Sequence, residues 1–166
     1  MMANMGEVID KAIIISGLNK VIKGISWLIK PMILLSMPLT KLRCFAKIQS
    51  KELSLPDSMF EDYYKDSQLL STLTLINILS ENTSFEFTSN SKIDSMVIVG
   101  DKEKSIMKKS AQRTASVLGH EVYFSFDDAA HGIPYEKAEV LNKLITSFLE
   151  GNHMTLDIDG VRSFKL

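Results

Sequence analysis

The sequence is poor in cysteine, proline and glycine: its 166 residues include one Cys, four Pro and eight Gly. A single thiol, Cys44, cannot form an intramolecular disulfide and fits no metal-ligand spacing, which excludes a disulfide framework and a structural zinc site. The small share of Gly and Pro excludes fibrous and low-complexity chains. We therefore expect no metal, no cofactor and a reducing, cytoplasmic compartment.

Net charge of either sign is also missing. Nineteen Lys and Arg residues against twenty Asp and Glu residues leave a formal charge of −1. A chain without a global basic field has little to hold a nucleic-acid backbone, so we expect no nucleic-acid partner.

Long uncharged apolar runs are absent as well. Residues 21–39 are rich in Ile, Leu and Met, but Lys23, Lys30 and Pro31 interrupt them, and about 18 uninterrupted apolar residues are needed to cross a bilayer. Residues 1–7 show no secretory leader pattern. These features predict a chain without a transmembrane span.

What the sequence does contain is typical of a folded domain: 45% apolar and 23% charged residues over a length that can bury one core. Residues 11–17, Lys-Ala-Ile-Ile-Ile-Ser-Gly, predict a strand buried on both faces of a sheet. Residues 95–100 have the same form, and residues 121–126 predict a third strand.

Helical patterns fill most of the remaining chain. Residues 104–118 have apolar side chains at helical spacing and end at Gly119, and a second helix is predicted to begin at Pro134 and end at Gly151. Residues 18–90 contain no convincing strand, and their helical patterns, of which 68–79 is the best, are broken by proline. The order predicts an α/β fold with about three parallel strands and an inserted helical part.

Two turns that follow predicted strands carry candidate chemistry. His131 lies between a strand and a helix, and Gly100-Asp101-Lys102-Glu103 follows the preceding strand. In parallel sheets, sites form at these strand ends. A carboxylate that accepts from the imidazole orients it and leaves the other ring nitrogen as a general base. The alternatives are an ordinary turn for the histidine and helix capping for the acids.

These residues carry a resemblance to a known family. Val-Gly-x-x-acid, followed one helix and one strand later by His-Gly-Ile-Pro and Glu136, resembles the C-terminal half of the α/β-hydrolase superfamily. The resemblance implies a core made of residues 1–17 and 91–151, a helical lid over 18–90 and a tail over 152–166. The alternating apolar pattern of that tail is compatible with either an extra edge strand or an ordered arm.

The resemblance also implies roles for individual residues. His131 corresponds to the catalytic base and Glu103 to the acid that orients it, with Asp101 as the alternative acid. The substrate implied is a small molecule with an ester, amide or similar acyl group. Aromatic and Met side chains of the lid are expected to line its pocket, although such residues also serve as lid packing: Trp27, Met32, Phe60 and Tyr64.

The nucleophile expected for this family is absent, because the chain contains no Gly-x-Ser-x-Gly. Ser26 is the nearest match, lacks the second Gly and is not expected to act. We therefore expect the C-terminal portion of a serine hydrolase, inactive alone. The alternatives are a degenerate hydrolase-like module that binds without catalysis, and a membrane-interface protein whose residues 21–39 dock with Lys20, Lys23, Lys30 and Lys41 facing the head groups.

The same resemblance places a nucleophile-bearing strand beside the first predicted strand. Without that neighbour, the strand from Ala12 to Ser16 exposes a row of unpaired backbone groups. We therefore expect self-association through Ala12 to Ser16.

Overall fold

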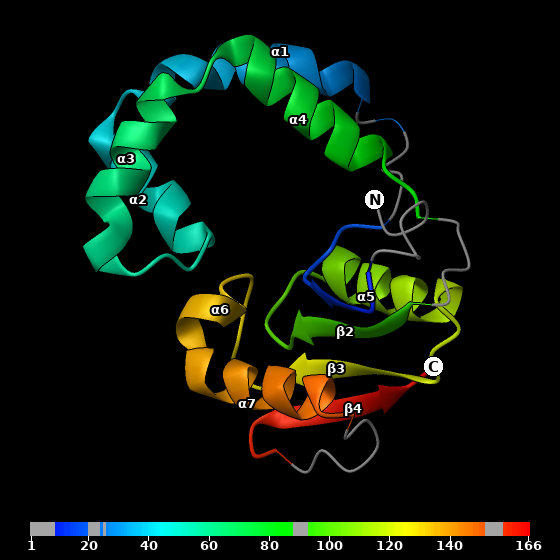
Figure 1. Cartoon of the computed structure of the whole chain (residues 1–166). Helices are drawn as coiled ribbons and strands as arrows, with labels where there is room; N and C mark the ends of the chain where they lie inside the picture. The colour runs from blue at the N-terminus through cyan, green and yellow to red at the C-terminus, as the bar shows by residue number, and fades with distance from the viewer. Residues whose placement is uncertain (1–8, 20–23, 25, 88–92, 152–157) are drawn as a thin grey trace. The chain divides into compact units, whose positions relative to one another are not determined.

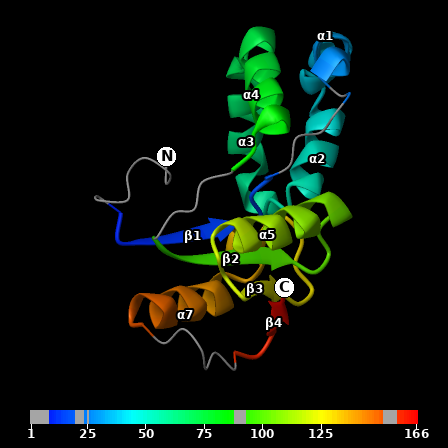
Figure 2. The same cartoon turned by 90° about the vertical axis from the view of Figure 1, so that its right-hand side faces the viewer.

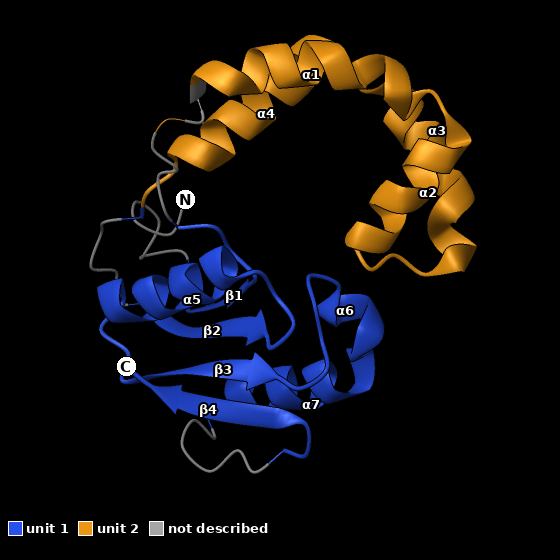
Figure 3. Cartoon of the chain, turned by 180° about the vertical axis from the view of Figure 1, so that it is seen from behind, with its two compact units in different colours: residues 1–19, 87–166 blue, residues 20–86 orange. Residues whose placement is uncertain are grey.

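The chain divides into two compact units, residues 1–19 with 87–166 and residues 20–86. A computed structural model describes residues 9–19, 24, 26–87, 93–151 and 158–166 (Figure 1). Figure 3 distinguishes the first unit, which contains the sheet, from the second, which is helical. The helical unit lies within the 18–90 range in which the sequence predicts an insertion.

The sheet has four strands in the order β1-β2-β3-β4: β1 (Lys11–Ile15), β2 (Asp94–Gly100), β3 (Val122–Phe126) and β4 (Val161–Lys165). The first three run parallel, as predicted, and β4 pairs antiparallel with β3. The α/β class is thus confirmed, and the sheet as a whole is mixed. In the tail, residues 161–165 form an edge strand, whereas residues 152–157 lie outside the described residues.

The first strand differs from its prediction. Every residue of β1 is half-buried rather than buried, because β1 lies at one edge of the described sheet and pairs on one side only, with β2. Directly after it, Ser16 adopts a φ of 49°, and its backbone N–H donates to the carbonyl of Ile98 at 2.9 Å.

Helices cover both faces of the sheet, as Figure 2 shows. On one face, α5 (Ser105–Val117) packs Ala111 and Ala115 on Val97 and Val99 of β2. On the other face, α6 (Ile133–Glu136) and α7 (Ala138–Leu149) form the larger core. Its fully or nearly fully buried members are Met96, Ile98, Phe126, Ala129, Ile133, Leu141, Leu144 and Phe148.

The helix predicted to begin at Pro134 is two helices. Lys137 leaves the helical region, with φ −132° and ψ 34°, and separates α6 from α7. The predicted helix ends are confirmed, since α5 and α7 are followed by Gly119 and Gly151, whose φ angles of 77° and 87° suit glycine.

The helical unit contains α1 (Ser26–Thr40), α2 (Arg43–Glu52), the short 3₁₀ helix η2 (Asp57–Met59), α3 (Phe60–Leu69) and α4 (Thr72–Ser84). Helix α1 packs on α4, and α2 packs on α3. Pro31 and Pro38 lie inside α1 instead of breaking it. Among the helices of the described segments, none is long and apolar enough to cross a membrane.

The prediction of one helix over residues 68–79 was wrong, because α3 ends at Leu69 and α4 begins at Thr72. Leu70 is extended and Ser71 begins a new helix, because the Ser71 hydroxyl accepts a hydrogen bond from the Thr74 N–H at 3.0 Å. This is an N-cap, and serine is among the residues that form it best.

Candidate functional site

The structure brings His131 and Glu103 together. Nδ1 of His131 lies 3.1 Å from Oε1 of Glu103. Glu103 is in the turn after β2, and His131 is in the loop after β3, so the expected contact between two strand-end loops is present. The Glu103 side chain is 5% exposed and the His131 side chain 47% exposed, which places a buried carboxylate behind an accessible ring.

Backbone contacts hold the two loops against each other. The N–H of Lys102 donates to the carbonyl of Ala129, and the N–H of Asp101 donates to the carbonyl of Phe126, both at 2.9 Å. A Cβ atom on Gly100 would lie 2.2 Å from the carbonyl oxygen of Ala129. Glycine at this position is therefore a requirement of the close approach, and the approach brings the acid within reach of the imidazole.

Side chains fasten the histidine loop at two further points. The N–H of Ala130 donates to Oε2 of Glu136 at 3.0 Å. Nζ of Lys102 lies 3.0 Å from Oδ1 of Asp128, and this hydrogen bond lowers the pKa of the Asp128 carboxyl. Both members of the ion pair are largely exposed, so the pair orients the loop more than it stabilises the fold.

The alternative acid, Asp101, has a different partner. Its Oδ2 lies 3.1 Å from Nη2 of Arg162, and Nε of the same guanidinium bonds Asp127. Arg162 belongs to β4, so it ties the tail to the turns after both β2 and β3. The sequence analysis missed Arg162, because it left the conformation of the tail open.

The pair has the geometry of an oriented general base. A carboxylate only accepts hydrogen bonds, so Nδ1 of His131 carries the shared proton and donates it. Nε2 then keeps its lone pair free to accept a proton on the accessible ring. Ser26, the nearest sequence match to a nucleophile, is the first residue of α1 in the helical unit.

The predicted substrate-binding residues all lie in the helical unit. Trp27 and Met32 are exposed on α1. On α3, Phe60 and Tyr64 stack with ring centroids 6.2 Å apart, and the guanidinium of Arg43 lies over both rings. A role in substrate binding stays a prediction for all four.

A second polar contact lies at the opposite end of β2. Oγ of Ser95 is 2.8 Å from Nε2 of His120, and burial lowers the pKa of His120 against the opposing effect of Asp94. Both border a cavity of about 500 Å³ whose lining is Asp94, Ser95, Met96, Val97, Gly119, His120, Glu121, Val122, Phe124, Phe148 and Ser163. The sequence analysis missed this contact, although neighbouring parallel strands also begin at a common edge of the sheet.

Metal binding has no evident place in the described segments, where no three His, Cys, Asp or Glu side chains come together as ligands. The polar groups described at this end of the sheet are those of the His131–Glu103 pair, of the Glu136 carboxylate, and of the three ion pairs that Lys102 forms with Asp128 and Arg162 forms with Asp101 and Asp127.

The comparisons with known proteins identify a fold and no family. No protein-family model and no curated protein matches the chain. Among solved structures, the chain is similar to that of Rv0554 from Mycobacterium tuberculosis, with a TM-score of 0.60 and 14% sequence identity over 90% of this chain. The chain spans 60% of the length of that structure. At this identity the similarity shows the fold alone.

Proposed function

We propose that this chain supplies the general base and the orienting acid of an α/β-hydrolase-type serine hydrolase that acts on an ester, amide or similar acyl substrate. The observation that carries the proposal is the contact of His131 with the buried carboxylate of Glu103. The pair lies in the loops that follow two neighbouring parallel strands, β2 and β3, which is the arrangement that the resemblance of Val-Gly-x-x-Glu and His-Gly-Ile-Pro implies.

In the proposed reaction, a serine hydroxyl from outside these 166 residues attacks the acyl carbonyl while Nε2 of His131 takes the hydroxyl proton. The imidazolium then returns that proton to the leaving group, which departs with the electrons of its bond to the acyl carbon. Water attacks the acyl-enzyme by the same route and restores the serine. Glu103 keeps Nδ1 protonated and stabilises the transient cation.

The burial of Glu103 suits this role. A carboxylate shielded from water interacts more strongly with a cation at a given distance than an exposed one does. Asp101 is the weaker candidate, because one of its oxygens already binds Arg162. The similarity to Rv0554, which covers 60% of that longer chain, is compatible with a nucleophile carried by additional sequence.

The test begins with the DNA upstream of the Met1 codon. An in-frame Gly-x-Ser-x-Gly is expected, and the product of the whole frame should hydrolyse p-nitrophenyl esters. In that product, His131→Ala and Glu103→Gln should each lower the rate by roughly 10³- to 10⁴-fold. The matched control Asp101→Asn should change it less than about tenfold.

The 166-residue chain alone should show no ester turnover above background, because it lacks a nucleophile and oxyanion-hole donors. Turnover by this chain that disappears in Ser26→Ala would contradict the proposal. A rate in the whole product that depends on Asp101 and not on Glu103 would reassign the acid.

A further inference from the structure

Within the helical unit, the face of α1 that points away from α4, here called the outer face, is apolar and uncovered. Ile29 and Ile33 are buried on the side that packs on α4. At about 100° a residue, the exposed residues span roughly 200° of the helix circumference. They include one charge, Lys30, and five large apolar side chains: Trp27, Met32, Leu34, Leu35 and Leu39. Soluble monomers seldom leave so continuous an apolar surface without a partner.

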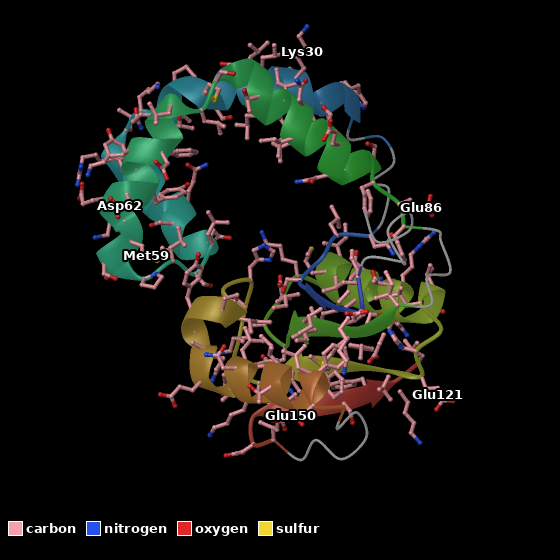
Figure 4. The ribbon with its side chains drawn as sticks, in the orientation of Figure 1. Lys30, Met59, Asp62, Glu86, Glu121 and Glu150 are labelled. Carbon is pink, nitrogen blue, oxygen red and sulfur yellow. The ribbon has the colours of Figure 1, made fainter. Side chains whose placement is uncertain are left out.

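The charges around this face have one sign. No Asp or Glu occurs between Asp10 and Glu52, whereas eight Lys or Arg residues do. Helix α4, the neighbour of α1, carries no charge before Glu81. Figure 4 shows Lys30 on α1, and Lys41 follows the last residue of the helix. Two cations, Lys30 and Lys41, therefore lie on or beside the apolar face, and α1 itself carries no acid.

We propose that the outer face of α1 docks on an anionic phospholipid surface. An uncovered apolar helix face that includes a Trp can insert between head groups and acyl chains. Each Lys beside the face adds attraction to an anionic surface. A second copy of the chain is a poorer occupant, because two such faces would bring Lys30 and Lys41 of both copies together, and α1 carries no acid to pair them. This inference does not depend on the proposed hydrolase function, since it uses no residue of the His131 site. It gives Trp27 and Met32 a role at a lipid surface in place of the substrate-binding role expected from the sequence.

The molecule contains its own reporter for the test. Trp27 is the only tryptophan and is 71% exposed on this face. The full chain is titrated with vesicles of phosphatidylcholine alone and with vesicles containing about 30% phosphatidylserine. We expect a blue shift of the emission and co-sedimentation with the anionic vesicles, with an affinity roughly tenfold higher than for the neutral ones. High salt should reduce that preference.

A matched pair of variants distinguishes vesicle binding through this face from non-specific binding by any exposed apolar side chain. Leu35 on α1 and Leu69 at the end of α3 are 80% and 84% exposed, so neither substitution by Glu should unfold the chain, which circular dichroism checks. Leu35→Glu should weaken vesicle binding about tenfold or more, whereas Leu69→Glu should leave it unchanged. Lys30→Glu should lower the preference for anionic vesicles about fivefold.

Several outcomes would overturn the proposal. One is an unchanged Trp27 emission with both kinds of vesicle, and another is an equal loss of binding in Leu35→Glu and Leu69→Glu. A blue shift that grows with protein concentration without lipid would instead identify a second copy as the occupant. Blue-shifted emission of the dilute, lipid-free chain would show that another part of the chain covers the face.

Discussion

The carbonyl oxygen of Ala129 lies 2.2 Å from the point at which a side chain on Gly100 would begin. Ala130 contributes a second carbonyl oxygen, 2.6 Å from the same point. Both obstacles are backbone atoms, which cannot move aside as a flexible side chain can. The turn that carries Glu103 and the loop that carries His131 are therefore in contact only because position 100 has no Cβ.

The first prediction is that Gly100→Ala separates these loops. The added methyl group should lower the free energy of unfolding by roughly 2–3 kcal/mol, as overpacking does, and should lengthen the His131–Glu103 contact. Gly119→Ala is the matched control, because its Cβ meets open space at a φ of 77° and should cost about 1 kcal/mol of strain. Urea unfolding of both variants measures the difference, and equal losses would contradict the prediction.

The second prediction concerns the proton on His131. Because Glu103 accepts from Nδ1, ring-nitrogen NMR shifts of the neutral imidazole should report the Nδ1-protonated tautomer. Glu103→Ala should shift the ring toward a mixture of tautomers, whereas Asp101→Asn should not, since Asp101 binds Arg162. If Asp101→Asn alone changed the tautomer, the partner of His131 would be Asp101 and not Glu103.

The third prediction is a pH dependence of stability that originates at His120. Burial lowers the pKa of this imidazole from its ordinary value of 6.5. As the pH falls, His120 therefore becomes protonated in the unfolded chain at a higher pH than in the folded chain. The group costs no stability above about pH 6.5, and stability falls as the pH drops from there through the lower native value. This component should be absent from His120→Gln, which keeps a polar partner for Ser95.

Urea unfolding followed by circular dichroism between about pH 8 and pH 5 checks this. The difference in stability between the wild type and His120→Gln should be constant above about pH 7 and should move against the wild type below 6.5. A constant difference over the whole range would disprove the assignment to His120.

The fourth prediction is that the chain self-associates through β1. Ile14 packs partly against Val97 and Val99, so Ile14→Lys should both weaken association and cost stability. Ile14→Ala is the control, since it should lose roughly 1–2 kcal/mol of packing but add no charge to the edge, and it should still associate. Light scattering at high concentration measures the effect, and a wild-type chain that stays monomeric would refute the prediction.

Much of the sheet unit could be predicted from the sequence, because its signals are local. Short β-branched runs ending in Gly, such as residues 95–100, specify buried parallel strands, and Gly119 and Gly151 specify helix ends. The contact of Glu103 with His131 followed from topology, since neighbouring parallel strands end at a common edge of the sheet.

The features that the sequence analysis predicted wrongly or did not find are those in which tertiary contacts decide the local conformation. The serine cap at Ser71 interrupts an apolar pattern that reads as one helix, and Pro31 lies within α1. The half-burial of β1 depends on its edge position, which its own residues do not encode. Arg162 has no local pattern at all, because its partners Asp101 and Asp127 are brought to it by the sheet.

The pairing of β4 with β3 makes the two margins of the described sheet chemically unequal. Without β4, the apolar strand β3 would form the second margin. With it, that margin presents Arg162 and Lys165, and charged margins resist the addition of further strands. The apolar edge of the sheet at β1 can pair with one strand of one other chain. Assembly through the sheet should therefore end at a closed pair with two-fold symmetry instead of continuing into a fibril.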